Sequence, residues 1–297
     1  MFLVLGSPRS GTTLLAQCLN ANPQISIPHE TDFIVPAAFL YQRLDSSELR
    51  KNLVAKLISG SRGFSTSLAE FFTHQDLLEI VDRHGATLLD LLCAIYDEIA
   101  RRSGARTAGD KSPNDLAFLR MIERVGALLS ERVKVVHIVR DVRDVVESIS
   151  RTNWMTNPSE RFPRVWSMAN MQANVLCRNR AEYLLLRYED FVADAESLLR
   201  SVCKHLDCDF DPRMLAPENR HPRYRKVRAH AMLYEPIQSS GIGRFRENLT
   251  PQQVESIERQ AAEAMTAFGY SLTSSFGRKY AEIAEDELGS ALRRPGH

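Results

Sequence analysis

Residues 2–13, FLVLGSPRSGTT, decide how this chain is expected to fold. The first four form a short apolar run that opens into Gly6 and a polar loop. A helical pattern then begins at Leu14 and continues through Cys18 and Leu19. This order predicts a strand, a tight turn and a helix. In such a layout the backbone N–H groups at the start of the helix face the loop and favour an anion.

The loop has the spacing of a phosphate-binding motif with one change. Gly6 and Gly11 stand at the glycine positions of the pattern G-x-x-x-x-G-K-[ST], and Thr13 stands at its hydroxyl position. Thr12 replaces the lysine. A nucleotide triphosphatase uses that lysine on its phosphates, so its absence argues for a phosphate ligand that is handled without that apparatus.

The remaining loop residues supply the donors that an anion needs. Gly11 lets the backbone approach a phosphate closely, and the N–H groups from Ser10 to Thr13 are expected to face it. Arg9 supplies the positive charge that the lysine would have given. The alternative is an ordinary turn between a strand and a helix, in which the glycine and the threonines only cap the helix.

Composition sets outer limits on function. The chain has 297 residues, of which 44% are hydrophobic and 25% charged, enough for one large core with a helical subdomain. A formal net charge of +1 gives no general attraction to nucleic acid or anionic membranes. Five cysteines without metal-ligand spacing predict a reduced compartment and no structural zinc. With no basic leader and no long apolar stretch, the expected location is the cytoplasm.

Two further predicted strands end in charged residues. A short extended segment at residues 23–28 leads to His29, Glu30 and Thr31, which makes Glu30 a candidate general base. An exposed loop glutamate is the alternative. The segment TAGDKSP, residues 107–113, stops at a proline and exposes Lys111 at a turn, where it is either a surface lysine or a site cation.

A second anion site is predicted at the end of residues 133–139, VKVVHIV, the most strand-like run in the chain. Arg140 follows this run directly, ahead of a helix that passes Ile149. Taken alone, an arginine here is explained equally well by pairing with Asp141 or Asp144. Two anion sites together are what a nucleotide with separate 3′- and 5′-phosphates requires.

Residues 8–13, PRSGTT, resemble the 5′-phosphosulfate-binding loop of the sulfotransferases, which use 3′-phosphoadenosine 5′-phosphosulfate as donor. In its motifs the chain is most similar to the tyrosylprotein and bacterial branch. There, a glutamate-threonine pair like Glu30-Thr31 follows the loop at this distance, and the glutamate is the general base. In other branches a histidine serves, so His29 is the weaker candidate. Asp32 stands where the protein-tyrosine enzymes have a basic residue, which argues against an acidic peptide acceptor.

The resemblance also implies roles for later residues. Lys111 matches the lysine that touches the bridging oxygen of the phosphosulfate, and Arg140 with Ser148 matches the pair that holds the 3′-phosphate. Tyr188, in the R-Y-E-D segment, is expected either against the adenine or satisfied by a core hydrogen bond. Ser240 and Arg244, in QSSGIGRFR, match the C-terminal nucleotide clamp.

The predicted fold is a single α/β domain over residues 1–297, with a central parallel sheet of four or five strands flanked by helices, as in P-loop proteins. Residues 33–106 are a helical, acceptor-side insertion, residues 153–165 a polar loop, residues 213–226 a surface loop and residues 278–297 a peripheral tail. The predicted reaction is sulfuryl transfer to an acceptor hydroxyl that the sequence does not identify, without a metal. A kinase-like phosphotransferase and a non-catalytic nucleotide-binding module are the rivals.

Overall fold

The computed structural model describes residues 1–126, 130–222 and 232–280. The chain divides into two compact units. The first comprises Met1–Val139 and Gln172–Ser239, and the second comprises Arg140–Met171 and the chain from Ser240 onward.

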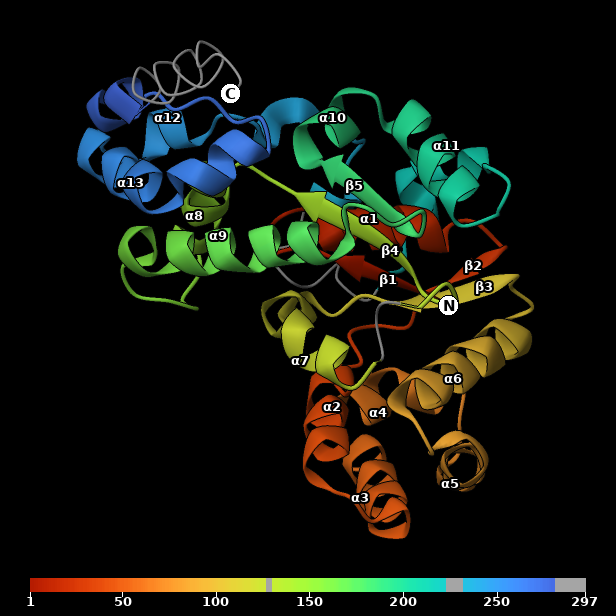
Figure 1. Ribbon diagram of the computed structural model, residues 1–297. Coiled ribbons are helices and arrows are strands. Elements are labelled where there is room, and N and C mark those ends of the chain that lie inside the picture. Colours follow the sequence, from red (N-terminus) through yellow and green to blue (C-terminus); the bar gives the residue numbers. More distant parts are fainter. Residues whose placement is uncertain (127–129, 223–231, 281–297) are drawn as a thin grey trace, which may run out of the picture. The chain divides into compact units, whose positions relative to one another are not determined.

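The first unit contains a five-stranded sheet in the order β2-β3-β1-β4-β5, in which every neighbouring pair is parallel (Figure 1). The strands are β1 (Phe2–Leu5), β2 (Ile25–Ser26), β3 (Thr107–Asp110), β4 (Lys134–Val139) and β5 (Tyr183–Arg187). Because parallel strands end at the same edge, the loops that follow them meet there. The predicted α/β architecture with four or five parallel strands is confirmed.

Apolar side chains on both faces of the sheet hold the first unit together. All four residues of β1 are buried, as expected for a parallel strand covered on both sides. Its alternate residues Phe2 and Val4 pack in one cluster with Leu15, Val136 and Ile138. This cluster fixes the ends of β1 and β4 and the start of the first helix, which are the parts that carry the predicted anion sites.

Helices and short 3₁₀ segments surround this sheet. The α-helices of the first unit are α1 (Thr12–Asn20), α2 (Ile34–Arg43), α3 (Ser47–Ser59), α4 (Arg62–Thr66), α5 (His74–His84), α6 (Leu88–Ser103), α7 (Leu119–Arg124), α10 (Tyr188–Ala193) and α11 (Ala195–His205). The 3₁₀ segments are η1 (Leu68–Glu70), η2 (Pro113–Phe118), η3 (Pro212–Leu215) and η4 (Pro217–Asn219).

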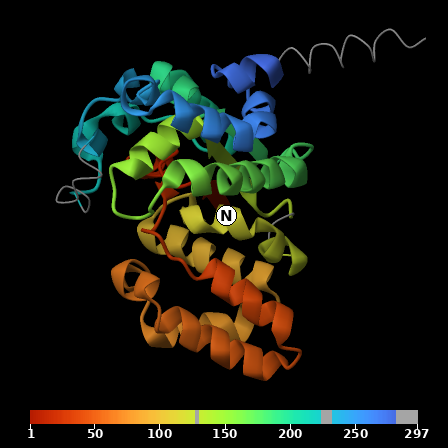
Figure 2. The same cartoon turned by 90° about the vertical axis from the view of Figure 1, so that its left-hand side faces the viewer.

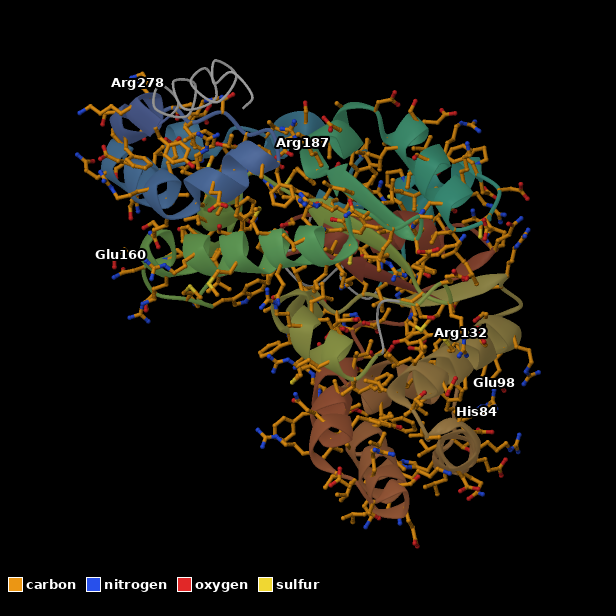
Figure 3. The ribbon with its side chains drawn as sticks, in the orientation of Figure 1. His84, Glu98, Arg132, Glu160, Arg187 and Arg278 are labelled. Carbon is orange, nitrogen blue, oxygen red and sulfur yellow. The ribbon has the colours of Figure 1, made fainter. Side chains whose placement is uncertain are left out.

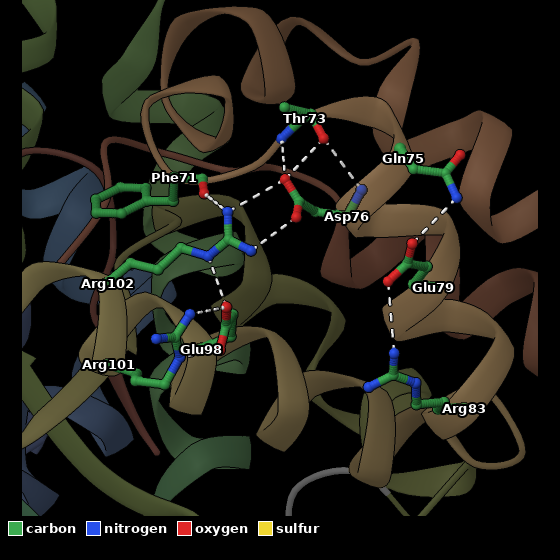
Figure 4. Close-up of polar contacts among 9 residues, drawn as sticks. All are labelled: Phe71, Thr73, Gln75, Asp76, Glu79, Arg83, Glu98, Arg101 and Arg102. Atoms are coloured by element: carbon green, nitrogen blue, oxygen red, sulfur yellow. Dashed lines mark hydrogen bonds and ion pairs between the residues drawn. The ribbon is translucent and has the colours of Figure 1, made fainter.

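Residues 33–106 are mainly helical, as predicted, and the orange part of the chain, which contains α2 to α5, lies together in both views (Figures 1 and 2). Arg102 ties α5 and the segment before it to α6. Its Nη2 lies 2.8 Å from Asp76 Oδ1 on α5, and its Nη1 donates to the carbonyl of Phe71 at 2.6 Å (Figure 4). Arg102, with help from Thr73, holds the pKa of Asp76 below its usual range. The insertion is therefore a connected layer rather than a set of independent helices.

The second unit is helical. It contains α8 (Val142–Ser150), most of α9 (Pro158–Cys177), α12 (Phe245–Asn248) and α13 (Pro251–Ala267), with η7 (Ser239–Gly241) ahead of α12. Buried Arg143 joins α8 to α13 by a 2.6 Å ion pair with Glu258. The hydroxyls of Thr273 and Ser274 also donate to Glu258, so this buried charge is fully engaged.

Most predicted elements are confirmed, with one correction. The predicted loop at residues 153–165 is wrong in its second half, because α9 begins at Pro158, a residue suited to the first helical position. The surface loop predicted at residues 213–226 contains η3 and η4, and its part at 223–226 lies outside the described residues. Of the predicted tail only residues 278–280 are described, where Arg278 donates to the carbonyl of Thr273 (Figure 3). One domain over the whole chain stays a prediction.

Candidate functional site

The loop between β1 and α1 has the backbone geometry of an anion cradle. Gly11 has φ +92°, a conformation that glycine adopts without strain, and it stands immediately before the first residue of α1. A Cβ on Gly11 would lie 2.5 Å from Cδ2 of Tyr188, and a Cβ on Gly6 would lie 2.7 Å from the carbonyl oxygen of Ile138. Close packing therefore requires both glycines, and the backbone conformation also favours glycine at position 11.

The start of α1 presents hydrogen-bond donors toward this loop. No side chain caps the helix, and no acidic residue stands in its first turn. The hydroxyl of Ser10 is fully buried and has no hydrogen-bond partner among the described residues. A buried polar group is normally satisfied, so Ser10 together with the positive end of the helix dipole fits a bound anion. Arg9 lies in the same loop, with φ +69°.

Glu30 and Lys111 meet beside this loop. Lys111 follows β3, the neighbour of β1 in the sheet, and its Nζ lies 2.5 Å from Glu30 Oε1. The same Nζ lies 3.5 Å from the hydroxyl of Thr13 on α1. The Lys111 side chain is 2% exposed and that of Glu30 is 33% exposed. The structure thus brings together a cation, a carboxylate and the loop, which the sequence predicted separately. The expected exposure of Lys111 is wrong, because its side chain is buried.

Sequence reasoning missed the buried carboxyl behind this pair. Asp110 accepts hydrogen bonds from the hydroxyls of Thr31 and Tyr96, each at 2.6 Å. Burial raises the pKa of Asp110, and the two hydroxyls and Lys111 oppose the rise. The adjacency of Asp110 to Lys111 was the only available signal. Tyr96 sits on a helix face where the sequence indicates nothing but core.

A cavity of about 70 Å³ opens next to Lys111 and Thr13. His29 lines it, as do Gln17 on α1 and Phe71 after η1. The cavity is therefore next to the cation and the start of α1, and Glu30 follows its lining residue His29 in the chain.

In the second unit, Arg140 and the segment 241–245 are held together at the start of α8. Arg140 is 7% exposed, and its Nη2 donates to the carbonyl of Gly241 at 2.7 Å. Asp144 accepts from the backbone N–H groups of Gly243 at 2.7 Å and Phe245 at 3.0 Å. Burial raises the pKa of Asp144, while these N–H groups and Arg140 oppose the rise. The segment that contains Arg244 is therefore bonded both to Arg140, just before α8, and to Asp144 on α8.

The other predicted donor-site residues have different surroundings. Ser148 is buried on α8, and Ser240 is exposed. Arg244 lies 3.8 Å from the buried Glu147. Tyr188, at the start of α10 next to Arg187 (Figure 3), is buried with its ring against Gly11. Both interpretations of Tyr188, a ring against the adenine and a hydroxyl in a core hydrogen bond, stay predictions.

A family model described as "Sulfotransferase family" matches residues 2–212. The chain belongs to the sulfotransferase family. The match includes the cradle, Glu30, Lys111 and Arg140, whereas Ser240 and Arg244 lie beyond it.

Solved structures show the same fold as this sulfotransferase. One is the sulfotransferase domain from the olefin synthase of Synechococcus PCC 7002, with 24% identity and a TM-score of 0.60 over 87% of this chain and 93% of that one. Another is the sulfotransferase domain from the curacin biosynthetic pathway, with 20% identity and a TM-score of 0.63 over 92% and 98%. A search of curated protein sequences gave no significant match.

Two features are absent from the described residues of this sulfotransferase. These residues contain no group of three or more His, Cys, Asp or Glu side chains arranged to hold a metal ion. Within the same ranges, no helix has both the length and the apolar character needed to cross a membrane.

Proposed function

We propose that this enzyme transfers a sulfuryl group from 3′-phosphoadenosine 5′-phosphosulfate to an acceptor hydroxyl, with Glu30 as general base. The observation that carries the proposal is the position of Lys111, whose Nζ reaches both the Glu30 carboxylate and Thr13 at the start of α1. One cation thus links the residue that would take the proton to the loop that would hold the donor.

The residues of the cradle have the chemistry that the 5′-phosphosulfate requires. The N–H groups from Ser10 to Thr13 and the guanidinium of Arg9 would bind its negative oxygens. The unsatisfied hydroxyl of buried Ser10 supports an anion at this place. Because Thr12 stands where a nucleotide triphosphatase has its lysine, the loop favours this donor over a triphosphate with magnesium.

The transfer step assigns one role to each charged side chain. Glu30 accepts the proton of the acceptor hydroxyl, whose oxygen forms a bond to sulfur as the bond from sulfur to the 5′-phosphate oxygen breaks. Lys111 stabilises the negative charge that collects on the departing oxygen. The products are a sulfated acceptor and adenosine 3′,5′-bisphosphate.

Residues of the second unit would recognise the 3′-phosphate. Arg140 is buried and follows β4 directly in the chain, and Ser148 comes two turns later on α8. Ser240 and Arg244 belong to the segment that Arg140 and Asp144 hold by hydrogen bonds. We assign all four to the 3′-phosphate and adenine. The proposed location is the cytoplasm, where free cysteines such as the five here are usual.

The test is mass-spectrometric. The purified chain is incubated with the phosphosulfate donor, a metal chelator and a pooled library of hydroxyl compounds, and the products are searched for an added sulfuryl group. We expect sulfated products together with adenosine 3′,5′-bisphosphate, and none with the matched Glu30→Gln variant over the same time. Phosphorylated products formed from adenosine triphosphate and magnesium would contradict the proposal.

A further inference from the structure

Two short segments that carry the predicted catalytic pair are cross-linked at three successive residues. Glu30 pairs with Lys111, and the next residue, Thr31, donates its hydroxyl to Asp110 at 2.6 Å. The residue after that, Asp32, donates its backbone N–H to the hydroxyl of Ser112 at 3.3 Å. The segments 30–32 and 110–112 are therefore fixed against each other on both sides of the Glu30–Lys111 contact.

Asp110 is the centre of this arrangement. Its carboxyl is 1% exposed, and one oxygen, Oδ1, accepts from both Thr31 and Tyr96. Tyr96 is fully buried and comes from α6, so the helical insertion takes part in holding the segments. A hydrogen bond to a buried carboxyl is worth more than an exposed one, since leaving that oxygen unsatisfied costs its full desolvation.

The helical insertion also packs against the residues on either side of Glu30. Ser67 donates its hydroxyl to the carbonyl of His29 at 2.8 Å. Gly63 on α4 lies so close that a Cβ there would sit 1.9 Å from the carbonyl oxygen of Thr31. The segment around Glu30 is thus confined between β3 on one side and α4 on the other.

We propose that Thr31, Asp110 and Tyr96 are positioning residues that hold the Glu30 carboxylate at Lys111. The proposal rests on the proposed roles of Glu30 and Lys111, and adds that the insertion acts on the chemistry through Tyr96. None of the three residues takes or gives a proton in the reaction. Their effect is geometric, and a misplacement of about 1 Å in a catalytic group can lower the rate by ~10²-fold.

The rate at which an acylating reagent modifies Lys111 measures how firmly this lysine is held, and the measurement does not depend on turnover. In the parent its 2% exposed ammonium should react slowly with an acylating reagent, whereas exposed Lys204 on α11 reacts fast. Thr31→Val keeps the shape of the side chain and removes its hydrogen bond. We expect it to raise the acylation rate of Lys111 about tenfold, the factor of one hydrogen bond to a charged group, through local opening.

Companion variants separate positioning from general loss of stability. Tyr96→Phe should act as Thr31→Val does, and Thr31→Ser should restore parental acylation because it keeps the hydroxyl. Tyr41→Phe is the matched control, since the Tyr41 hydroxyl donates to Gly85 within the same insertion but away from Glu30. Alkylation of Cys203, 1% exposed in the main core, reports global unfolding and should stay at the parental rate.

The labelling outcomes decide the proposal. Faster acylation of Lys111 in Thr31→Val and Tyr96→Phe, with Cys203 unchanged, supports it. An unchanged rate, or equal acceleration of Lys111 and Cys203, overturns it.

Turnover tests the underlying function separately. Thr31→Val should lower kcat about tenfold or more while leaving the Kd of adenosine 3′,5′-bisphosphate unchanged. A positive labelling result together with full turnover in Glu30→Gln would keep the positioning role and reject Glu30 as the base. Unchanged labelling with inactive Glu30→Gln would keep the base and reject the positioning role.

Discussion

The Glu30 carboxylate carries the proposed proton transfer, and its replacement isolates that role. Glu30→Gln keeps the size of the side chain and an oxygen for Lys111 but takes no proton. We predict that turnover falls by about 10²–10⁴, the usual contribution of a positioned base. The Kd of adenosine 3′,5′-bisphosphate and the melting temperature should remain near parental values. Steady-state kinetics measures turnover, and calorimetry measures the Kd and the melting temperature.

His29 provides the control for this prediction. It lines the cavity beside Lys111 and precedes Glu30, so it is the next candidate if Glu30→Gln retains turnover. His29→Ala in the same assay would then lose activity. Full turnover in both variants would show that neither residue is the base.

Arg140 is predicted to bind the 3′-phosphate by charge-assisted hydrogen bonds. Arg140→Ala should weaken the binding of adenosine 3′,5′-bisphosphate by about 2–3 kcal/mol, the scale of such bonds. Adenosine 5′-monophosphate, which lacks the 3′-phosphate, should bind almost as before. Arg151→Ala, at the other end of α8, is the matched control and should affect neither ligand. Equal losses for both ligands in Arg140→Ala would mean that Arg140 acts only through its bond to Gly241.

Individual residues were predictable from the sequence where they follow a strand. Glu30 and Lys111 come after predicted strands of a parallel sheet, and chain order alone places such residues at one edge. Tyr96 was not predictable, because it lies on an amphipathic helix among Leu92 and Ile99, where a tyrosine indicates only core. Its link to Asp110 depends on how α6 lies against β3, which no local pattern encodes.

Among the elements, the junction of β1 and α1 allows a sharp test of the cradle. Gly11→Ala places a side chain at φ +92° and against Tyr188. We predict a loss of unfolding free energy greater than the roughly 1–2 kcal/mol of a left-handed residue alone, with weaker bisphosphate binding. Denaturant unfolding and calorimetry measure these two quantities.

Gly104→Ala is the matched control for this substitution. Gly104 has φ +68°, and no atom lies within 4 Å of a Cβ built there, so only the backbone cost of roughly 1–2 kcal/mol applies. Similar losses of stability in the two variants, with bisphosphate binding intact in Gly11→Ala, would show that the close packing of the loop does not matter.

The start of α9 shows why some element boundaries escape sequence analysis. Residues 153–165 were predicted as loop because they are rich in polar residues. Pro163 lies inside the helix and cannot donate to the carbonyl of Ser159. In the structure that carbonyl accepts from the amide of Gln260 on α13 at 3.1 Å. A partner almost a hundred residues away compensates for the proline, and local periodicity does not reveal it.

At the scale of the whole molecule, buried carboxyls are expected to shape the dependence of stability on pH. Burial raises the pKa of Asp115 well above its ordinary value of 3.8, and the charges of Asp110 and Asp32 add to the rise. A raised folded-state pKa gives a contribution that is fully present below 3.8 and is lost as pH rises. The raised pKa therefore lowers the stability of the protein at neutral pH, where the unfolded chain ionises Asp115 more readily than the folded chain does.

Asp115→Asn should remove this cost. We predict a melting temperature roughly 2–4 °C higher at pH ~7, the shift that about 1 kcal/mol gives in a chain of this size. The gain should shrink toward zero below pH ~4, where the carboxyl is protonated in both states. Asp45→Asn, at an exposed position, should show no such pattern. Calorimetric scans across pH provide the measurement, and a gain that persists undiminished at low pH would contradict the stated cause.

At the same scale, the central claim is that this chain binds a nucleotide with separate 3′- and 5′-phosphates. The most direct test is titration calorimetry of the intact chain with adenosine 3′,5′-bisphosphate in the presence of a metal chelator, compared with adenosine triphosphate. We predict tight, magnesium-independent binding of the bisphosphate, stronger than that of the triphosphate by about tenfold or more, the factor of one charged hydrogen bond. Equal affinity for the two nucleotides, or an absolute requirement for magnesium, would contradict the account.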